Sequence, residues 1–401
     1  MKKGNNIDLE YGANPNPMNE RKQVALLFGA GFSAPAGLPT ARILNENLKS
    51  KIESNLNNSN NIRNTDMYSQ DKDKNARKLL FEIISLYSRE FECFDYEEFY
   101  DFLHSSSVRV GRYEEVINKF VTERITLGDY VCCITEIYNK LINRLLTIPY
   151  NNLDVYDDLE DFLSHVARQY VINVHTLNHD LLFEQLIETA NLQMNFSDGF
   201  TEIGSPYYGI YENKEYNVRY HCRLARFTNN YKDKAIRLYK LHGSLNYVLH
   251  SRCKESIVLE PDACLKIPLG INYKNILEEI EGKDEYGVYP FAEHPYFLSG
   301  TNTKCKMYGD SLIWRRLQEN FKQNLRKANC LIIIGYGCKD KVINESIKKN
   351  LGNVSKKVYL IDPKPSENVS AFAREIKAEI IKMGVGEVDF SQFNLYLCNT
   401  H

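Results

Sequence analysis

The stretch LLFGAGFSAPAGLPTAR, residues 26–42, places three glycines, two prolines and an arginine directly behind an apolar run. Its segment GAGFSA (29–34) matches the Gly-x-Gly-x-x-Ala pattern of loops that bind dinucleotides. Gly29 and Gly31 would let the backbone approach a pyrophosphate that lies at the N-terminus of a helix. The match is weak on its own, and a chance glycine turn stays open as the alternative.

Five short runs of the chain are apolar at consecutive positions, which indicates strands buried on both faces of a parallel sheet. Helical patterns follow four of these runs. The alternation predicts an α/β fold, a Rossmann-like doubly wound parallel sheet. The predicted strands are 24–29, 170–176, 236–243, 330–337 and 357–363, and the predicted helices are 40–52, 178–190, 339–351 and 366–380.

The glycine loop does not continue as it would in a dehydrogenase. There, the next strand ends in an acidic residue about 20 positions on. Here the helical pattern runs into an Asn-rich segment, and the next predicted strand begins at residue 170. No Gly-Lys-[Ser/Thr] follows the loop, which excludes the phosphate-binding loop of nucleoside triphosphatases. We therefore expect a dinucleotide site with a different layout.

The length of 401 residues allows one large domain or two modest ones. We expect an N-terminal arm and one Rossmann-like domain with two insertions. A polar, Asn-rich stretch predicts a mobile loop, and helical periodicity after it predicts a helical subdomain. The ranges are 1–20 for the arm, 21–401 for the domain, 53–165 for the mobile loop (53–78) with the helical insertion, and 250–310 for an irregular insertion.

Charge and composition narrow the possible partners. The formal net charge of -2 gives no overall attraction to nucleic acid, so direct nucleic-acid binding is not expected. The ten cysteines form no Cys-x-x-Cys pair, so we expect no metal and a reducing compartment. The N-terminus lacks an apolar signal segment, and no window reaches the roughly 18 apolar residues of a membrane span. We expect a cytoplasmic protein without membrane association.

Four blocks of sequence, in this order, resemble the sirtuin family. GAGFSAPAGLPTAR (29–42) looks like the sirtuin glycine loop, and HTLNHD (175–180) looks like its Thr-Gln-Asn-Ile-Asp block. KLHGS (240–244) resembles the block that carries the catalytic histidine. IIIGYGCKD (332–340) resembles the late glycine loop in the form found in sirtuin-like proteins of bacterial antiphage defence. Each block stands at the end of a predicted strand.

The chain departs from sirtuin deacylases in ways that point to another reaction. It lacks the four-cysteine zinc module, has Thr40 and Ala41 in place of Asp-Phe, and has Leu177 in place of a glutamine. The resemblance therefore implies an NAD+ glycohydrolase that cleaves NAD+ to nicotinamide and ADP-ribose. It also implies an antiphage effector that acts by NAD+ depletion. An NAD-dependent protein deacylase and a non-catalytic NAD+ or ADP-ribose sensor remain as alternatives.

The resemblance also implies partners. Effectors of this kind stay inactive until infection, so we expect a homo-oligomer and a partner protein from the same operon. A HerA-type DNA translocase or a short Argonaute-type protein would fit. NAD+ is expected as the substrate, with no metal.

Two polar residues at predicted strand ends form the candidate catalytic pair. Asn178 could orient a water or hold a ribose hydroxyl; the alternative is that it caps a helix N-terminus. His242 could accept a proton from a ribose hydroxyl or align the attacking water; the alternative is a buried core histidine. His175 and His179 are expected to turn away from the site.

The remaining candidates would bind other parts of NAD+. Asp180 would accept from the nicotinamide carboxamide, unless it only favours a helix start. Arg42 would reach a phosphate or a ribose hydroxyl, unless it forms a surface ion pair. The amides of 30–33 would bind the pyrophosphate, Tyr336 would stack on or pack beside the adenosine half, and Asp362 would bind its ribose or only form a turn. The full set is Gly29, Ala30, Gly31, Phe32, Ser33, Leu38, Pro39, Arg42, Thr176, Asp180, Gly335, Tyr336, Gly337 and Asp362.

Overall fold

A computed structural model describes most of the chain between residues 21 and 393. The arm predicted for 1–20 lies outside the described residues. The described ranges are 21–55, 67–91, 94–121, 126–205, 207–213, 216, 218–251, 264–271, 289–291, 295–300, 308, 311–352 and 356–393.

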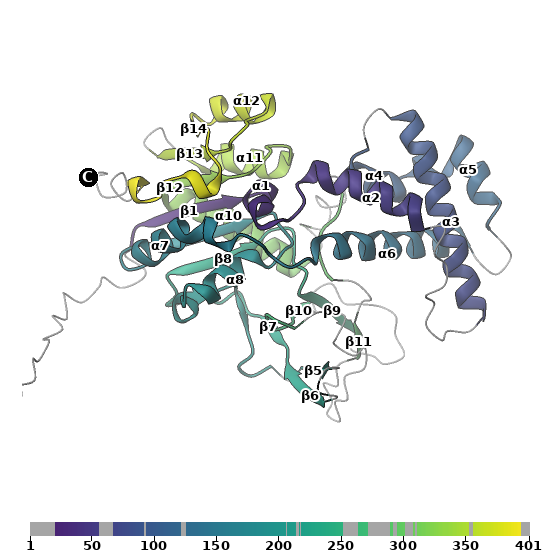
Figure 1. The fold of residues 1–401 in the computed structure, drawn as a ribbon, viewed down its shortest axis with the longest axis horizontal. Coiled ribbons are helices and arrows are strands. Elements are labelled where there is room, and N and C mark those ends of the chain that lie inside the picture. Colours follow the sequence, from purple (N-terminus) through teal and green to yellow (C-terminus); the bar gives the residue numbers. More distant parts are fainter. Residues whose placement is uncertain are drawn as a thin grey trace, which may run out of the picture.

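A parallel sheet of seven strands forms the centre of the fold (Figure 1). β1 lies between β12 and β2 and pairs with both in parallel. The five predicted strands are all present, and their order from β8 to β13 reads 3-2-1-4-5, which is the Rossmann order. The predicted fold class is confirmed. The strands, from edge to edge, are β14 (Glu379–Ile381), β13 (Lys357–Ile361), β12 (Ala328–Ile334), β1 (Gln23–Phe28), β2 (Val171–Thr176), β8 (Ile236–Lys240) and β3 (Phe196–Ser197).

The two edge strands, β14 and β3, were not predicted. The pattern over 366–380 predicts one helix, but α12 (Glu367–Glu375) ends early and β14 follows it. Lys377 adopts a φ of 54°, a left-handed conformation that ends a helix and turns the chain. β3 has only two residues, too few to show a periodicity.

Helices cover both faces of the sheet (Figure 1). Leu26 and Phe28 of β1 pack on one face with α7 and α8, and Ala25 and Leu27 pack on the other with α10, α11 and α12. Strand side chains alternate between faces, so β1 must be apolar throughout to be buried on both. The helices are α7 (Asp157–Val166), α8 (Leu182–Thr189), α10 (Leu312–Lys327) and α11 (Lys341–Asn350), with the short turns η4 (Leu153–Tyr156), η5 (Gln193–Asn195) and η7 (Val385–Glu387).

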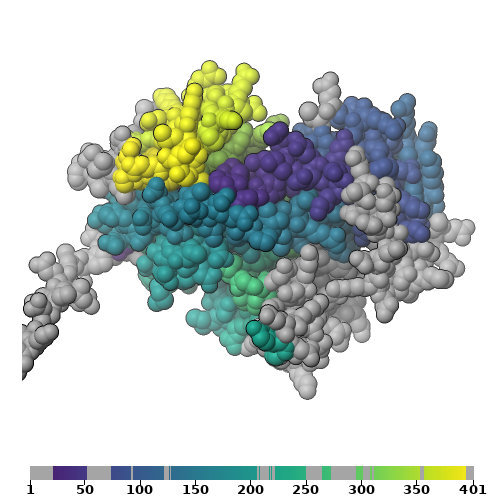
Figure 2. All heavy atoms as spheres, in the orientation of Figure 1, coloured from purple at the N-terminus to yellow at the C-terminus, as the bar shows by residue number. Residues whose placement is uncertain are grey.

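A helical body, α2 to α6, lies beside the sheet (Figure 1). In the space-filling view, the purple N-terminal segment lies between the yellow C-terminal elements and the teal elements (Figure 2). This body, called the insert below, has its own apolar core, which Leu245 and Phe297 join. Its elements are α2 (Ala41–Asn55), α3 (Met67–Glu90), α4 (Tyr96–His104), η3 (Ser106–Arg109), α5 (Gly111–Asn118) and α6 (Leu127–Leu146).

The mobile loop predicted for 53–78 is helical at both of its described ends. α2 runs to Asn55 and α3 begins at Met67, and residues 56–66 between them lie outside the described part. α3 buries Ala76, Leu79 and Leu80 in the core of the insert. Tertiary packing of this kind extends a helix into a polar stretch of low helix propensity.

A five-stranded antiparallel sheet and a two-stranded hairpin complete the described fold. Three of these strands lie in 247–291, and much of the predicted irregular insertion, 250–310, falls outside the described residues. None of the helices in the described part has the length and apolar character of a membrane span. The strands are β11 (Tyr289–Phe291), β9 (Tyr247–Ser251), β10 (Cys264–Lys266), β7 (Ala225–Phe227) and β4 (Phe200–Thr201) in sheet order, and β5 (Tyr208–Asn213) with β6 (Val218–Arg223).

Candidate active site

The two glycine loops meet at the carboxyl ends of β1 and β12. The strand order reverses between these two strands, and ligands of doubly wound sheets bind at such a switch point. The Gly31 amide donates to the Gly335 carbonyl at 2.9 Å, and the Gly29 amide donates to the Ile334 carbonyl at 3.0 Å. The first and last of the four sequence blocks are therefore in contact at the carboxyl ends of the parallel strands.

Three glycines of these loops are required by their contact with each other. A Cβ added to Gly29 or Gly31 would lie 2.7 Å from the backbone of Gly335. Gly335 has a φ of 62°, and a Cβ there would overlap the backbone of Gly31. Gly337 differs, because a Cβ at that position meets nothing within 4 Å among the described residues. Close packing of the two loops thus explains the first three glycines, and Gly337 faces open space.

Part of the predicted pyrophosphate loop is already engaged within the chain. The Gly31 amide donates to Gly335, and the Phe32 amide donates to the Gly29 carbonyl at 2.9 Å. The Phe32 ring stacks on Phe28 with 4.0 Å between centroids and belongs to the core, as does Leu38. The prediction of pyrophosphate binding therefore narrows to Ala30 and Ser33.

Asn178 connects the second sequence block to the first. Its Nδ2 donates to the Gly29 carbonyl at 3.0 Å and to Ser33 Oγ at 2.9 Å. Its own amide donates to Thr176 Oγ1 at 3.0 Å. α8 begins at Leu182 without a side-chain cap, so the helix-capping alternative for Asn178 is wrong. With both Nδ2 hydrogens in use, Oδ1 is the atom left to accept from a ligand.

Asp180 is buried and serves first as a local turn residue. Its Oδ1 accepts from the Leu182 amide at 3.0 Å, just ahead of α8. The Asp180 carbonyl accepts from Lys240 Nζ, which also pairs with Glu184 at 3.1 Å. Lys240 and Glu184 are 1% and 5% exposed, so this ion pair is dry. It fixes the segment that carries Asn178 and Asp180 to the strand that leads to His242.

His242 lies just beyond β8 and is 4% exposed. Its Nε2 is 3.2 Å from Asp340 Oδ2, a distance that forms an ion pair when the ring is protonated. The rings of His179 and Tyr308 each have their centroid 6.4 Å from that of His242.

The backbone around His242 is fixed by a glycine. Gly243 has a φ of 90°, and a Cβ there would lie 2.6 Å from the Cα of Phe297. The His242 carbonyl accepts from the Leu298 amide at 2.8 Å. The Leu245 amide in turn donates to the His179 carbonyl at 2.9 Å. The histidine block is therefore held between the loop after β2 and the segment 296–298.

The two other histidines of the second block differ in position. His175 is fully buried in β2, where its Nδ1 donates to the Leu26 carbonyl at 3.1 Å and its Nε2 accepts from Asn324 at 3.1 Å. Burial lowers its pKa to about 3, which keeps the ring neutral. The expectation that His175 turns away is confirmed. For His179 it is wrong, because its ring packs on Phe297 (4.7 Å) near His242.

Several predicted binding residues have local roles. Arg42 is exposed on α2 and lies 3.7 Å from Glu46, as in its surface alternative. Asp362 Oδ1 accepts from the Lys364 amide at 2.8 Å in a turn. Tyr336 is buried, and its hydroxyl donates to Asn344 Oδ1 at 2.9 Å. Pro39 is half-buried in the loop before α2. Binding of NAD+ by these side chains stays a prediction.

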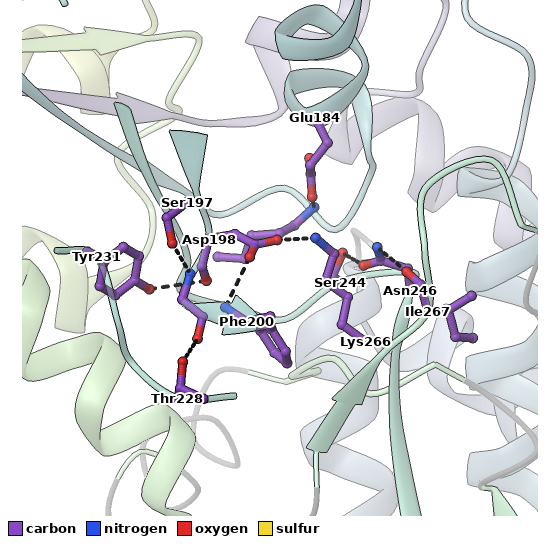
Figure 3. A network of polar contacts seen from close by, with 12 residues as sticks. Glu184, Ser197, Asp198, Phe200, Thr228, Tyr231, Ser244, Asn246, Lys266 and Ile267 are labelled. Carbon is purple, nitrogen blue, oxygen red and sulfur yellow. Dashed lines mark hydrogen bonds and ion pairs between the residues drawn. The ribbon is translucent and has the colours of Figure 1, made fainter. Parts of the chain in front are cut away.

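A polar network ties the antiparallel sheet to the parallel one (Figure 3). Lys266 of β10 pairs with Asp198, whose carbonyl accepts from Tyr231 at 3.2 Å. Burial opposes the charge of Lys266, but attraction by Asp198 and Glu184 outweighs it and raises the pKa of the ammonium group. The network is a scaffold for the loop between β3 and β4.

Sequence reasoning missed Asp340 and the pair of Lys240 with Glu184. The signal for the pair was present, because each charge interrupts an otherwise apolar strand or helix face. Asp340 stands inside a block that was recognised, but it also suits a helix N-terminus and gives no sign of a distant partner. Within the described ranges, no group of three or more His, Cys, Asp or Glu side chains is placed to hold a metal.

Comparison with known proteins identifies the family. The model of the SIR2-like domain matches residues 173–381. No curated protein matches the chain. A Sir2 homologue mutant in complex with ADP-ribose is 13% identical over 96% of both chains, with a TM-score of 0.36. Sir2 with a p53 peptide and NAD+ is 13% identical over 95% of this chain and 96% of the other, with a TM-score of 0.38. These likenesses are loose, but the family model covers more than half of the sequence: the chain belongs to the SIR2-like domain family.

Proposed function

We propose that this chain is an NAD+ glycohydrolase that cleaves NAD+ to nicotinamide and ADP-ribose. Membership of the SIR2-like family supports an NAD+-dependent activity. The observation that carries the proposal is the contact between all four sequence blocks: Asn178 bonds to Gly29 and Ser33, and His242 faces Asp340 from the last block.

The reaction needs a polar site that stabilises positive charge on the ribose and positions a water. Cleavage of a glycosidic bond passes through a state like an oxocarbenium ion, which fixed dipoles stabilise better than mobile water does. Asn178 is held by two bonds through Nδ2, so Oδ1 is preorganised to accept from water or a ribose hydroxyl. His242 would take the proton released by the attacking water or by a ribose hydroxyl.

We further propose that this activity serves antiphage defence by depleting NAD+. The resemblance of GYGCKD (335–340) to the late loop of sirtuin-like defence proteins supports this role. An enzyme that destroys NAD+ must stay inactive in a healthy cell, so a homo-oligomer or a partner protein from the same operon would control it. A HerA-type DNA translocase or a short Argonaute-type protein would fit.

The test is nicotinamide release from NAD+ by the full chain, with and without the products of neighbouring genes. Asn178→Ala and His242→Ala should each lower the rate by at least about a hundredfold. Exposed His165 on α7 and exposed Asn195 provide matched controls, since His165→Ala and Asn195→Ala remove the same side chains elsewhere. Thermal unfolding of each variant separates lost chemistry from lost folding.

The outcomes distinguish three functions. Release that both site variants abolish and both controls retain supports the hydrolase. Release that requires an acyl-lysine peptide, with deacylated peptide as product, would replace it with a deacylase. Tight NAD+ binding without release under any condition would leave a sensor.

A further inference from the structure

We propose that Asp340 is a positioning residue for His242, with one carboxylate oxygen fixed to α11 and the other directed at the imidazole. Asp340 Oδ1 accepts from the Val342 amide at 3.0 Å and from the Ile343 amide at 3.1 Å. Its Oδ2 lies 3.2 Å from His242 Nε2. The two residues come from loops on either side of β1 and β2, so the contact spans the candidate site. The catalytic consequence rests on the proposed function.

The loop that carries the Asp340 carboxylate is held by contacts beyond the helix cap. The Tyr336 hydroxyl, which donates to Asn344, also lies 3.2 Å from the Asp340 carbonyl, and Asn344 Nδ2 donates to the Cys338 carbonyl at 2.8 Å. The loop 336–340 is thus closed on the first turn of α11. A carboxylate fixed in this way cannot follow a moving ring, so it sets the position of His242.

The groups around His242 come from several elements. Asp340 supplies a negative charge 3.2 Å from the imidazole, and the rings of His179 and Tyr308 lie with their centroids 6.4 Å from that of His242. Lys240 of β8 is paired with Glu184. Next to Asp340, burial raises the pKa of Tyr336, with Asp340, Cys338 and Glu97 of α4 adding to the effect. Tyr336 therefore stays neutral and can act as a donor beside the Asp340 carboxylate.

A fixed carboxylate beside an imidazole makes the ring a stronger base and fixes its orientation. In the proposed reaction, His242 takes up a proton, and Asp340 would stabilise the imidazolium that results. Asp340 is not expected to touch the substrate. Its removal should lower kcat and leave KM nearly unchanged.

The test is Asp340→Asn in the full chain. Asparagine caps a helix about as well as aspartate, so the bonds to Val342 and Ile343 are kept while the charge is lost. The first readout is an NMR titration of the His242 ring, assigned by the signal that disappears in His242→Gln. The titration midpoint should fall by about one pH unit. Asp389→Asn is the control, because Asp389 accepts from the Ser391 amide in an exposed turn.

The second readout is the pH profile of nicotinamide release. The acid limb of kcat should shift to lower pH by about the same amount, and kcat on its plateau should fall about tenfold. An unchanged titration midpoint and acid limb in Asp340→Asn would overturn the proposal. A shifted midpoint in a chain that releases no nicotinamide would support the pairing and reject the hydrolase. Asp340→Ser, which keeps a cap but is too short to reach His242, should repeat the shift if one variant unfolds.

Discussion

His175 lies inside β2 and His242 lies just past the end of β8, and both side chains are almost completely buried. The interior of the sheet surrounds His175 with groups that suit a neutral ring, a carbonyl on one nitrogen and an amide on the other. The carboxyl edge places a carboxylate beside His242. Burial is therefore common to both regions, and the charge of the partner separates them.

The difference teaches which buried histidine has a chemical role. A ring whose two nitrogens are satisfied by fixed neutral partners gains nothing from a second proton, and desolvation penalises the charged form. A carboxylate beside the ring favours the protonated form and so offsets that penalty. The following changes test whether the interior and the edge differ in this way.

The largest expected effect on stability is at the carboxyl edge of the sheet. There, alanine substitutions at two glycines of one loop should differ strongly in their cost. Gly335→Ala should lower the free energy of unfolding by about 3 kcal/mol, because φ is 62° and the Cβ would overlap the Gly31 backbone. Gly337→Ala should change it by less than about 1 kcal/mol. If NAD+ lies against Gly337, the same variant should raise KM. Urea unfolding and steady-state kinetics measure both; equal stability losses would contradict the distinction.

In the interior of the sheet, His175 should make the free energy of unfolding depend on pH. Burial lowers the pKa of folded His175 to about 3, so the unfolded chain takes up a proton first as the pH falls. Its contribution to stability is complete above about pH 6.5 and is lost as the pH falls toward 3. Between pH 7.5 and 5.5 the loss should be about 1.4 kcal/mol.

The matched variant for this measurement is His175→Gln. Glutamine could donate to the Leu26 carbonyl and accept from Asn324 but does not titrate. Urea unfolding at both pH values should therefore show a shallower dependence in the variant. An identical dependence in wild type and variant would assign the acid sensitivity to other groups.

The smallest effect is expected at Arg42, which was predicted at the edge but is exposed on α2. Its approach to Glu46 is 3.7 Å between two mostly exposed side chains. Arg42→Ala should change the free energy of unfolding by no more than about 0.5 kcal/mol. Nicotinamide release should also stay within twofold if the pair is only a surface contact. A large increase in KM would return Arg42 to the binding site.

The sheet was predictable because each main strand carries its own signal. Val24 to Phe28 are apolar on every position, and a strand buried on both faces requires this. β14 could not be predicted, since the turn at Lys377 depends on a single backbone conformation within a helical pattern. The start of α8 was also missed, because 178–181 use their polar groups for other contacts.

For the site, the sequence predicts the four blocks that form it but not the contacts between their side chains. Asn178 and Ser33 are 145 residues apart in the sequence, and no local pattern shows that their side chains bond. The family resemblance indicates that the blocks belong to one site, whereas the fold shows what each side chain contacts. Phe32 and Leu38 pack in the core, and Asn178 Nδ2 bonds to the glycine loop. Which side chains meet at the carboxyl edge of the sheet depends on the order of the strands, and this order cannot be read from a single sequence.

The insert also shares its interior with the site. Leu245 and Phe297, in the segments that hold His242, are part of the core formed by α2 to α6. Gly300 lies so close to Tyr100 of α4 that a Cβ there would be 3.0 Å from its ring. The helices are therefore not a detachable module: cutting them out would strip apolar cover from the segments that hold the histidine. A tilt of these helices would reach the segments around His242 through this shared packing.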